Sequence, residues 1–137
     1  MKVLIDTCVI LDYLQARDPY FDGALNIMIG IANYEYEGYI TASSMTDLYY
    51  IIHKHTHNND LTRTYISKLI SLTGVLDTTA ADCVNALHGK TADYEDAVMI
   101  ETADRTGMDC IITRNVKDYS ASRVRVMMPV DFLMSNS

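Results

Sequence analysis

The sequence of 137 residues has no tryptophan, only two prolines and no long hydrophobic run. No segment approaches the roughly 20 consecutive apolar residues that a membrane span requires, so we expect no membrane association. No linker rich in proline, glycine or serine divides the chain, and its length is close to that of one typical domain. Asp6 follows only three apolar residues, too few for a secretory signal. We therefore predict a single cytoplasmic domain over residues 1–137.

Cysteine is also scarce. The three cysteines, Cys8, Cys83 and Cys110, are an odd number and have no CxxC spacing. This pattern argues against a disulfide framework and against a structural zinc site. Reduced, mostly buried thiols are expected instead, which agrees with a cytoplasmic location.

Positive charge is in short supply, with 11 Lys and Arg against 18 Asp and Glu and a net charge of −7. This balance argues against wide non-specific binding of nucleic acid. Two features qualify that conclusion. Five of the 11 cations fall between residues 105 and 125, which leaves room for a local basic rim. Acidic residues gathered in a metal pocket would also make net charge a poor guide, because bound divalent cations reverse the local field.

Short apolar runs alternate with helical patterns along the whole chain. Val3 to Ile5 predicts a strand, and a helix follows it with Thr7 as a possible cap. Strands that alternate with helices predict an α/β fold with a parallel sheet covered on both faces. Further strands are predicted at 39–41, 75–77, 110–113 and 124–127, and further helices from Pro19 to Gly38, from Ser44, from Asp60 or Thr62 to Gly74, at 79–87, at 93–106, and from Pro129.

Acidic residues follow the predicted strands. Asp6 comes directly after the first strand, and Asp118 comes soon after the strand at 110–113. Asp47 and Asp96 lie at the starts of helices that follow strands. In parallel α/β sheets these places meet at the carboxyl edge, where ligands bind. Singly, each acid has a structural alternative: Asp47 as part of a capping box opened by Ser44, Asp96 as a helix-start residue, and Asp118 as a turn former.

Carboxylates that converge on one edge repel one another and raise each other's pKa unless a cation neutralises them. Oxygen ligands without His or Cys favour Mg²⁺ or Mn²⁺, which are commonly bound by a few carboxylates and by substrate phosphates. One or two such ions can activate a water and stabilise charge on phosphoryl oxygens. The pattern therefore predicts a metal-dependent reaction on a phosphate ester.

Four segments follow one another with a specific order and spacing across nearly the whole chain: Leu4-Ile5-Asp6-Thr7-Cys8-Val9-Ile10, Ser44-x-x-Asp47-Leu48, Asp93-Tyr94-Glu95-Asp96-Ala97, and Ile112-Thr113-Arg114-Asn115-x-x-Asp118-Tyr119. In this order and spacing they resemble PIN-domain ribonucleases, especially VapC-like toxins. The resemblance implies an endoribonuclease with a three-layer α/β/α sandwich and a central, mostly parallel sheet. It also implies Mg²⁺ or Mn²⁺ in an acidic pocket, an RNA substrate, a cognate antitoxin partner and a homodimer.

By this resemblance, Asp6 is the first metal ligand and Asp96 the third acid, with Asp93 an accessory or helix-start acid. Asp47 stands where most members have Glu. The family's fourth acid commonly follows Thr-Arg directly, but that position here is Asn115, and Asp118 is three residues further on. Asp118 is therefore the candidate for the missing carboxylate, and Asn115 for orienting water or binding metal through its carbonyl oxygen.

Neighbouring polar residues complete the predicted site. The hydroxyls of Thr7, Ser44 and Thr113 are candidates for orienting carboxylates or water, with helix capping as the alternative for each. Arg114 is a candidate for contact with a substrate phosphate, and pairing with a nearby acid is its alternative.

A second hypothesis is a non-catalytic PIN-like module that binds RNA or protein, suggested by Asn115 and by the net acidity. An aspartyl-phosphate phosphatase is disfavoured, because a second Asp is usual two residues after the first and Cys8 stands there.

Tyrosines concentrate at 34–50. They pack the core or form an exposed stripe for a homodimer or antitoxin, and the sequence leaves both open.

Overall fold

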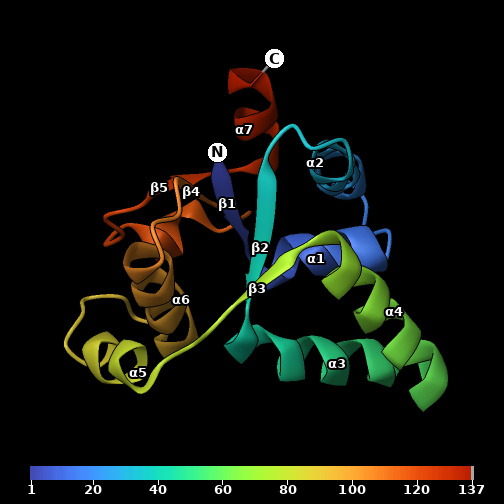
Figure 1. The fold of residues 1–137 in the computed structure, drawn as a ribbon, viewed down its shortest axis with the longest axis horizontal. Coiled ribbons are helices and arrows are strands. Elements are labelled where there is room, and N and C mark those ends of the chain that lie inside the picture. Colours follow the sequence, from blue (N-terminus) through green and yellow to red (C-terminus); the bar gives the residue numbers. More distant parts are fainter. Residues whose placement is uncertain (137) are drawn as a thin grey trace.

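Five parallel strands form the central sheet of the computed structural model, which describes residues 1–136 (Figure 1). The strand order is β3-β2-β1-β4-β5. All four strand pairings are parallel, which confirms the parallel sheet predicted from the sequence. The strands are β1 (Lys2–Ile5), β2 (Glu37–Thr41), β3 (Gly74–Leu76), β4 (Cys110–Ile112) and β5 (Arg125–Met127).

Helices cover both faces of this sheet, so the three-layer α/β/α fold is confirmed (Figure 1). Alternation along β1 sends Val3 and Ile5 into a core shared with α1, α2, α3, α4 and α7, whereas Leu4 packs in a second core with α6. In residues 1–136 no helix is long and apolar enough to cross a membrane. The helices are α1 (Thr7–Leu14), α2 (Phe21–Ala32), α3 (Ala42–Thr56), α4 (Asn59–Leu72), α5 (Ala80–Ala86), α6 (Tyr94–Arg105), the short 3₁₀ helix η1 (Val116–Tyr119) and α7 (Pro129–Ser135).

The first strand lies in the middle of the sheet, hydrogen-bonded to β2 on one side and to β4 on the other. Its last residue, Ile5, pairs with Ile112 of β4. From β1 the chain builds the sheet first to one side, through β2 and β3, and then to the other side, through β4 and β5. Ligands of α/β sheets bind at the point where the strand order reverses in this way. The residues that follow β1, β2 and β4 are therefore brought to one edge.

The second helix is shorter than the sequence pattern predicts. It begins at Phe21, with Pro19 in the preceding turn, and it ends at Ala32. Gly38 does not stop this helix but lies within β2. A Cβ atom at Gly38 would come within 2.8 Å of Cγ1 of Ile31, so this position needs glycine for packing.

Two helix starts near the predicted site also differ from expectation. Asp6 caps α1, because its Oδ1 accepts a hydrogen bond of 2.7 Å from the backbone N–H of Thr7. The third helix starts one turn earlier than predicted, after Thr41, so the predicted capping box of Ser44 and Asp47 is wrong. Asp47 lies beyond the first turn of α3 and has no capping role there.

The remaining caps follow the expected chemistry more closely. Thr79 caps α5 in a capping box, and Asp93 caps α6 by accepting a hydrogen bond from the N–H at position 96. The start of α4 was predicted at Asp60 or Thr62 but is capped by Asn58. Asn, Asp and Thr all serve as caps, so sequence alone does not choose among them.

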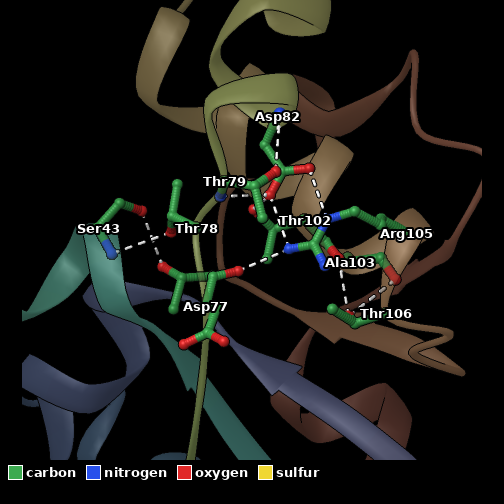
Figure 2. A network of polar contacts seen from close by, with 10 residues as sticks. Ser43, Asp77, Thr78, Thr79, Asp82, Thr102, Ala103, Arg105 and Thr106 are labelled. Atoms are coloured by element: carbon green, nitrogen blue, oxygen red, sulfur yellow. Dashed lines mark hydrogen bonds and ion pairs between the residues drawn. The ribbon is translucent and has the colours of Figure 1, made fainter.

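A polar network ties the start of α3 to α5 and α6 (Figure 2). Arg105 donates to both carboxylate oxygens of Asp82, at 2.9 and 2.8 Å, and to the carbonyl oxygen of Asp77, at 2.6 Å. The N–H of Ser43 donates to Oγ1 of Thr78 at 3.1 Å. The segment between β3 and α5 is thereby fixed to the two helices, α3 and α6, that carry predicted site acids.

Candidate active site

A cleft of about 470 Å³ opens at the carboxyl edge of the sheet. Four acids line it: Asp6 after β1, Asp47 on α3, and Glu95 and Asp96 on the first turn of α6. Asn115, just after β4, also lines the cleft. The structure thus brings three of the sequence-predicted acids to one place and adds Glu95, which the sequence analysis did not single out.

Asp6 is the most rigidly held of these acids. Its side chain is buried, and Oδ2 accepts a hydrogen bond of 2.7 Å from Oγ1 of Thr113. The thiol of Cys8 lies 3.5 Å from the same oxygen. Oγ1 of Thr113 in turn accepts a hydrogen bond of 3.0 Å from the N–H of Asn115. Thr113 therefore orients Asp6, and Thr7 fixes the other carboxylate oxygen through its backbone N–H.

Asp96 is half-buried at the start of α6. Burial and the negative charges of Asp6, Asp93 and Asp118 raise the pKa of Asp96 to about 6. A hydrogen bond of 3.0 Å from the hydroxyl of Tyr119 acts in the opposite direction and lowers this pKa. Asp93 contributes charge and caps the helix, so the structure supports its helix-start role.

Glu95 and Asp47 both line the cleft, and their carboxyl groups lie close to each other. The pKa of Glu95 is raised well above its usual range, first by a hydrogen bond with Asp47 and then by burial and by the charge of that carboxylate. The charges of Asp93 and Asp96 act in the same direction. The acids of the cleft therefore repel one another, and a cation bound among them would relieve that repulsion.

The predicted fourth acid, Asp118, lies outside the cleft lining. Asp118 is exposed on η1 and does not line the cleft, although its charge is close enough to raise the pKa of Asp96. Asn115, the residue directly after Thr113-Arg114, does line it. The position where the resemblance implies the family's fourth acid is therefore occupied by a neutral side chain.

Arg114 pairs with an acid, which is the alternative to the predicted contact with a substrate phosphate. Its guanidinium donates to both carboxylate oxygens of the buried Asp12, at 2.6 and 3.2 Å, and lies 4.0 Å from the ring centroid of Tyr20. Two more cations of the expected basic rim are paired as well: Arg105 with an acid of α5 and Arg123 with Asp104. Acids therefore pair with three of the five cations expected for a basic rim at 105–125.

Ser44 also lies apart from the acids. It is buried, and its Oγ shares a hydrogen bond of 2.7 Å with Oγ1 of Thr41. This contact joins the end of β2 to the start of α3. Ser44 therefore supports the helix that carries Asp47 and makes no direct contact with a carboxylate among residues 1–136.

Several lining or supporting residues were missed by sequence reasoning, namely Cys8, Arg17, Tyr50, Glu95 and Tyr119. Glu95 lies in the acidic segment that the sequence analysis recognised, so its neighbour Asp96 was a signal for it. Tyr119 follows the candidate Asp118, but its burial beneath Asp96 depends on the turn of η1. The other three gave no signal, because their direction depends on how α1 and α3 meet the sheet.

Comparison with known proteins decides the family. A family model described as "PIN domain" matches residues 2–117. The chain belongs to the PIN-domain family. No curated protein matches it significantly in sequence.

Solved structures share the PIN-domain fold over nearly the full chain. The VapBC2 complex of Rickettsia felis bound to promoter DNA has a chain 14% identical, with a TM-score of 0.71 over 93% of this chain and 98% of that one. A toxin–antitoxin complex of Klebsiella pneumoniae is 21% identical, with a TM-score of 0.67 over 93% and 97%. VapC20 of Mycobacterium tuberculosis, a sarcin–ricin loop cleaving toxin, is 12% identical, with a TM-score of 0.66 over 90% and 98%. The fold is thus that of VapC toxins.

The cleft of this PIN domain has the donor chemistry of a Mg²⁺ or Mn²⁺ site. Asp6, Asp47, Glu95 and Asp96 offer carboxylate oxygens only, and Asn115 adds an amide oxygen. In the part of the chain that the structure describes, no three His, Cys, Asp or Glu side chains converge tightly enough to hold an ion by themselves. Mg²⁺ keeps several water ligands and needs only a few carboxylates, so the residues fit such an ion.

Proposed function

We propose that this PIN domain is a metal-dependent endoribonuclease that hydrolyses phosphodiester bonds of RNA, and that it is the toxin component of a toxin–antitoxin pair. The cleft carries this proposal: four carboxylates, on segments far apart in the sequence, line one opening at the carboxyl edge of the sheet. Their mutual repulsion is unfavourable for folding by itself, which argues for a function that uses a cation.

Asp6, Asp47 and Asp96 are the proposed holders of Mg²⁺ or Mn²⁺, with Asp118 as the further acid predicted from the sequence and Glu95 as the one that the structure adds. Such ions lower the pKa of water and stabilise negative charge on phosphoryl oxygens. In the hydrolysis, the water oxygen bonds to phosphorus and the bond from phosphorus to the 3′-oxygen breaks. The products are a 3′-hydroxyl and a 5′-phosphate.

The chain's own residues prepare this chemistry. Thr113 and the N–H of Thr7 hold the two carboxylate oxygens of Asp6 in fixed directions. The hydroxyl of Tyr119 donates to Asp96 and favours its ionised form. The amide of Asn115, which lines the cleft, is the proposed group for orienting water or a phosphate oxygen. Preorganised groups of this kind lower the barrier to reaction because they need no rearrangement during it.

The antitoxin proposal rests on the structural neighbours. Two of those reported above are toxin–antitoxin complexes, and one is a toxin that cleaves the sarcin–ricin loop. We propose a cognate antitoxin for this PIN domain, and also the homodimer and the cytoplasmic location expected from the sequence. The tyrosines at 34–50 do not form one continuous stripe, since Tyr36 is buried whereas Tyr34 and Tyr50 are exposed.

The test is cleavage of a mixed set of structured RNAs with Mn²⁺ by the wild type, Asp6→Asn and Asp96→Asn. We expect cleavage by the wild type and its loss in both variants and in EDTA. Asp60→Asn, at an exposed acid on α4 outside the cleft, is the matched control and should cut like the wild type. Thermal unfolding with and without Mn²⁺ adds a readout of ion binding, expected to rise in the wild type and less in Asp6→Asn.

Equal cleavage in every sample, EDTA included, would reveal a contaminating nuclease, which further purification would remove. Two results would contradict the proposal. Cleavage that survives both substitutions would place the reaction elsewhere. Absence of cleavage by folded wild type, together with no Mn²⁺-induced stabilisation, would favour the alternative of a non-catalytic module that binds RNA or protein.

A further inference from the structure

Arg17 is the only Lys or Arg among the residues that line the acidic cleft. It follows α1, and its N–H donates to the carbonyl oxygen of Asp12 at 3.0 Å, which fixes its backbone. Its guanidinium donates from Nε and Nη2 to Oε1 of Gln15, at 3.0 and 2.6 Å. Gln15 is neutral, so this contact orients the guanidinium without forming an ion pair.

Three other arginines differ from Arg17 in their partners. Arg105, Arg114 and Arg123 each make an ion pair with an Asp, whereas Arg17 makes none within residues 1–136. A half-buried guanidinium that is oriented by a neutral partner and makes no ion pair is suited to binding an anion that enters the cleft.

Tyr50 supplies a second feature of the same cleft. It lies on α3 one turn after Asp47 and lines the opening, yet 61% of its surface is exposed. Nζ of Lys54 lies 4.8 Å from the centroid of its ring. This cation–π contact holds the ring and adds a positive charge beside it. An exposed aromatic ring next to a cation is the arrangement on which unpaired bases stack.

We propose that Arg17 and Tyr50 together bind one nucleotide of single-stranded RNA, Arg17 through its phosphate and Tyr50 through its base. The inference rests on the proposed function and assigns two residues that hold the substrate at the same site. A base within a duplex is already stacked on both faces, so a stacking platform selects unpaired RNA. Arg17 draws the phosphate toward acids that would otherwise repel it.

The experiment measures binding separately from cleavage. A short unpaired RNA carrying 2-aminopurine is titrated with protein in Ca²⁺, and its fluorescence and anisotropy are recorded, with RNA integrity verified afterwards. The same RNA with one abasic position and a blunt duplex are the comparison ligands. Wild-type binding should quench 2-aminopurine, which reports stacking, and should favour the unpaired RNA over the duplex.

Tyr50→Ala should abolish the quench and weaken binding of the base-containing RNA about tenfold, with little effect on the abasic RNA. Tyr50→Phe should retain both signals. Arg17→Gln should weaken the binding of both the base-containing and the abasic RNA, and it should reduce the salt dependence of binding by about one phosphate contact. Arg17→Lys should keep most of that salt dependence. Tyr34→Ala is the matched control, because Tyr34 is an exposed tyrosine at the opposite edge of the sheet, and it should bind like the wild type.

This inference would be overturned, and the proposed function left intact, if the wild type cuts RNA but the Tyr50→Ala and Arg17→Gln variants bind the RNAs and quench 2-aminopurine as the wild type does. Equal binding of duplex and unpaired RNA by the wild type would overturn it too. Wild type that neither cuts nor binds any of these RNAs would overturn the proposed function and this inference with it.

Discussion

Oγ1 of Thr113 donates a hydrogen bond of 2.7 Å to Oδ2 of Asp6, two residues that are 107 positions apart in the sequence. The contact exists because β1 and β4 are neighbours that end together, with Ile5 paired to Ile112. Each residue is the first after its strand. The pairing of the two strands thus sets the direction of the most buried carboxylate in the cleft.

Thr113→Val should therefore reduce RNA cleavage about 10- to 100-fold, because partners of metal-binding carboxylates typically contribute that much to affinity or activity. The apparent affinity for Mn²⁺, measured by titration, should fall as well. Thr113→Ser keeps the hydroxyl and should keep most of the activity. If the valine variant cuts as fast as the wild type, Asp6 does not depend on this hydrogen bond.

Tyr119→Phe should raise the pKa of Asp96 above about 6, since the hydroxyl that favours the ionised carboxylate is removed. The carboxylate would then be protonated over a wider pH range, and Mn²⁺ binding near pH 6 should weaken more than binding at pH 8. NMR titration of the Asp96 carboxyl carbon measures the shift directly. A lower or unchanged pKa in the variant would contradict the assigned role of Tyr119.

Removing Arg114 should affect stability and leave RNA binding unchanged. Arg114→Met leaves the buried Asp12 unpaired, which should lower the free energy of unfolding by about 3 kcal/mol. The double variant Asp12→Asn/Arg114→Met should recover part of that loss. Urea denaturation measures both. A large fall in RNA affinity with little change in stability would instead support contact between Arg114 and substrate phosphate.

The pair of Asp82 and Arg105 should stabilise the fold above pH 4 and lose that contribution in acid. The Arg105 hydrogen bond lowers the pKa of Asp82 to about 2, so the unfolded chain binds this proton more readily. Its contribution is complete above the ordinary pKa near 4 and disappears as the pH falls toward 2. Asp82→Asn should cost about 2 kcal/mol at pH 7, because the residue is buried although its partner is partly exposed.

The difference between Asp82→Asn and the wild type should shrink as the pH falls from 4 to 2. Asp104→Asn is a suitable control, because Asp104 pairs with the exposed Arg123 and should cost less than about 1 kcal/mol. Thermal unfolding across this pH range follows both variants. A constant difference at all pH values would show that ionisation of Asp82 contributes nothing to stability.

The alternation of strands and helices could be predicted because β1, β3 and β4 are short apolar runs followed directly by a polar residue. The convergence of Asp6, Asp47 and Asp96 followed from the same rule about strand ends. The extent of the second helix could not be predicted, because Gly38 looks like a helix stop and only the covering side chain of Ile31 reveals its role in β2.

The ion pairs were also beyond the sequence. Arg114 had two reasonable partners, a substrate phosphate or an acid, and only the packing of α1 against the segment after β4 brings it to Asp12. Arg17 and Tyr50 carry no pattern of their own. Their position in the cleft depends on a left-handed residue at position 16 and on the angle at which α3 leaves β2.

The central position of β1 has a consequence for synthesis of the chain. The ribosome makes β1 before the other strands of this sheet, but its neighbour β4 emerges about a hundred residues later, and Asp6 has no Thr113 to contact until then. The cleft is consequently among the last features of the domain to form during translation. For the proposed ribonuclease, this order would keep the nascent chain inactive toward the message and the ribosome that produce it.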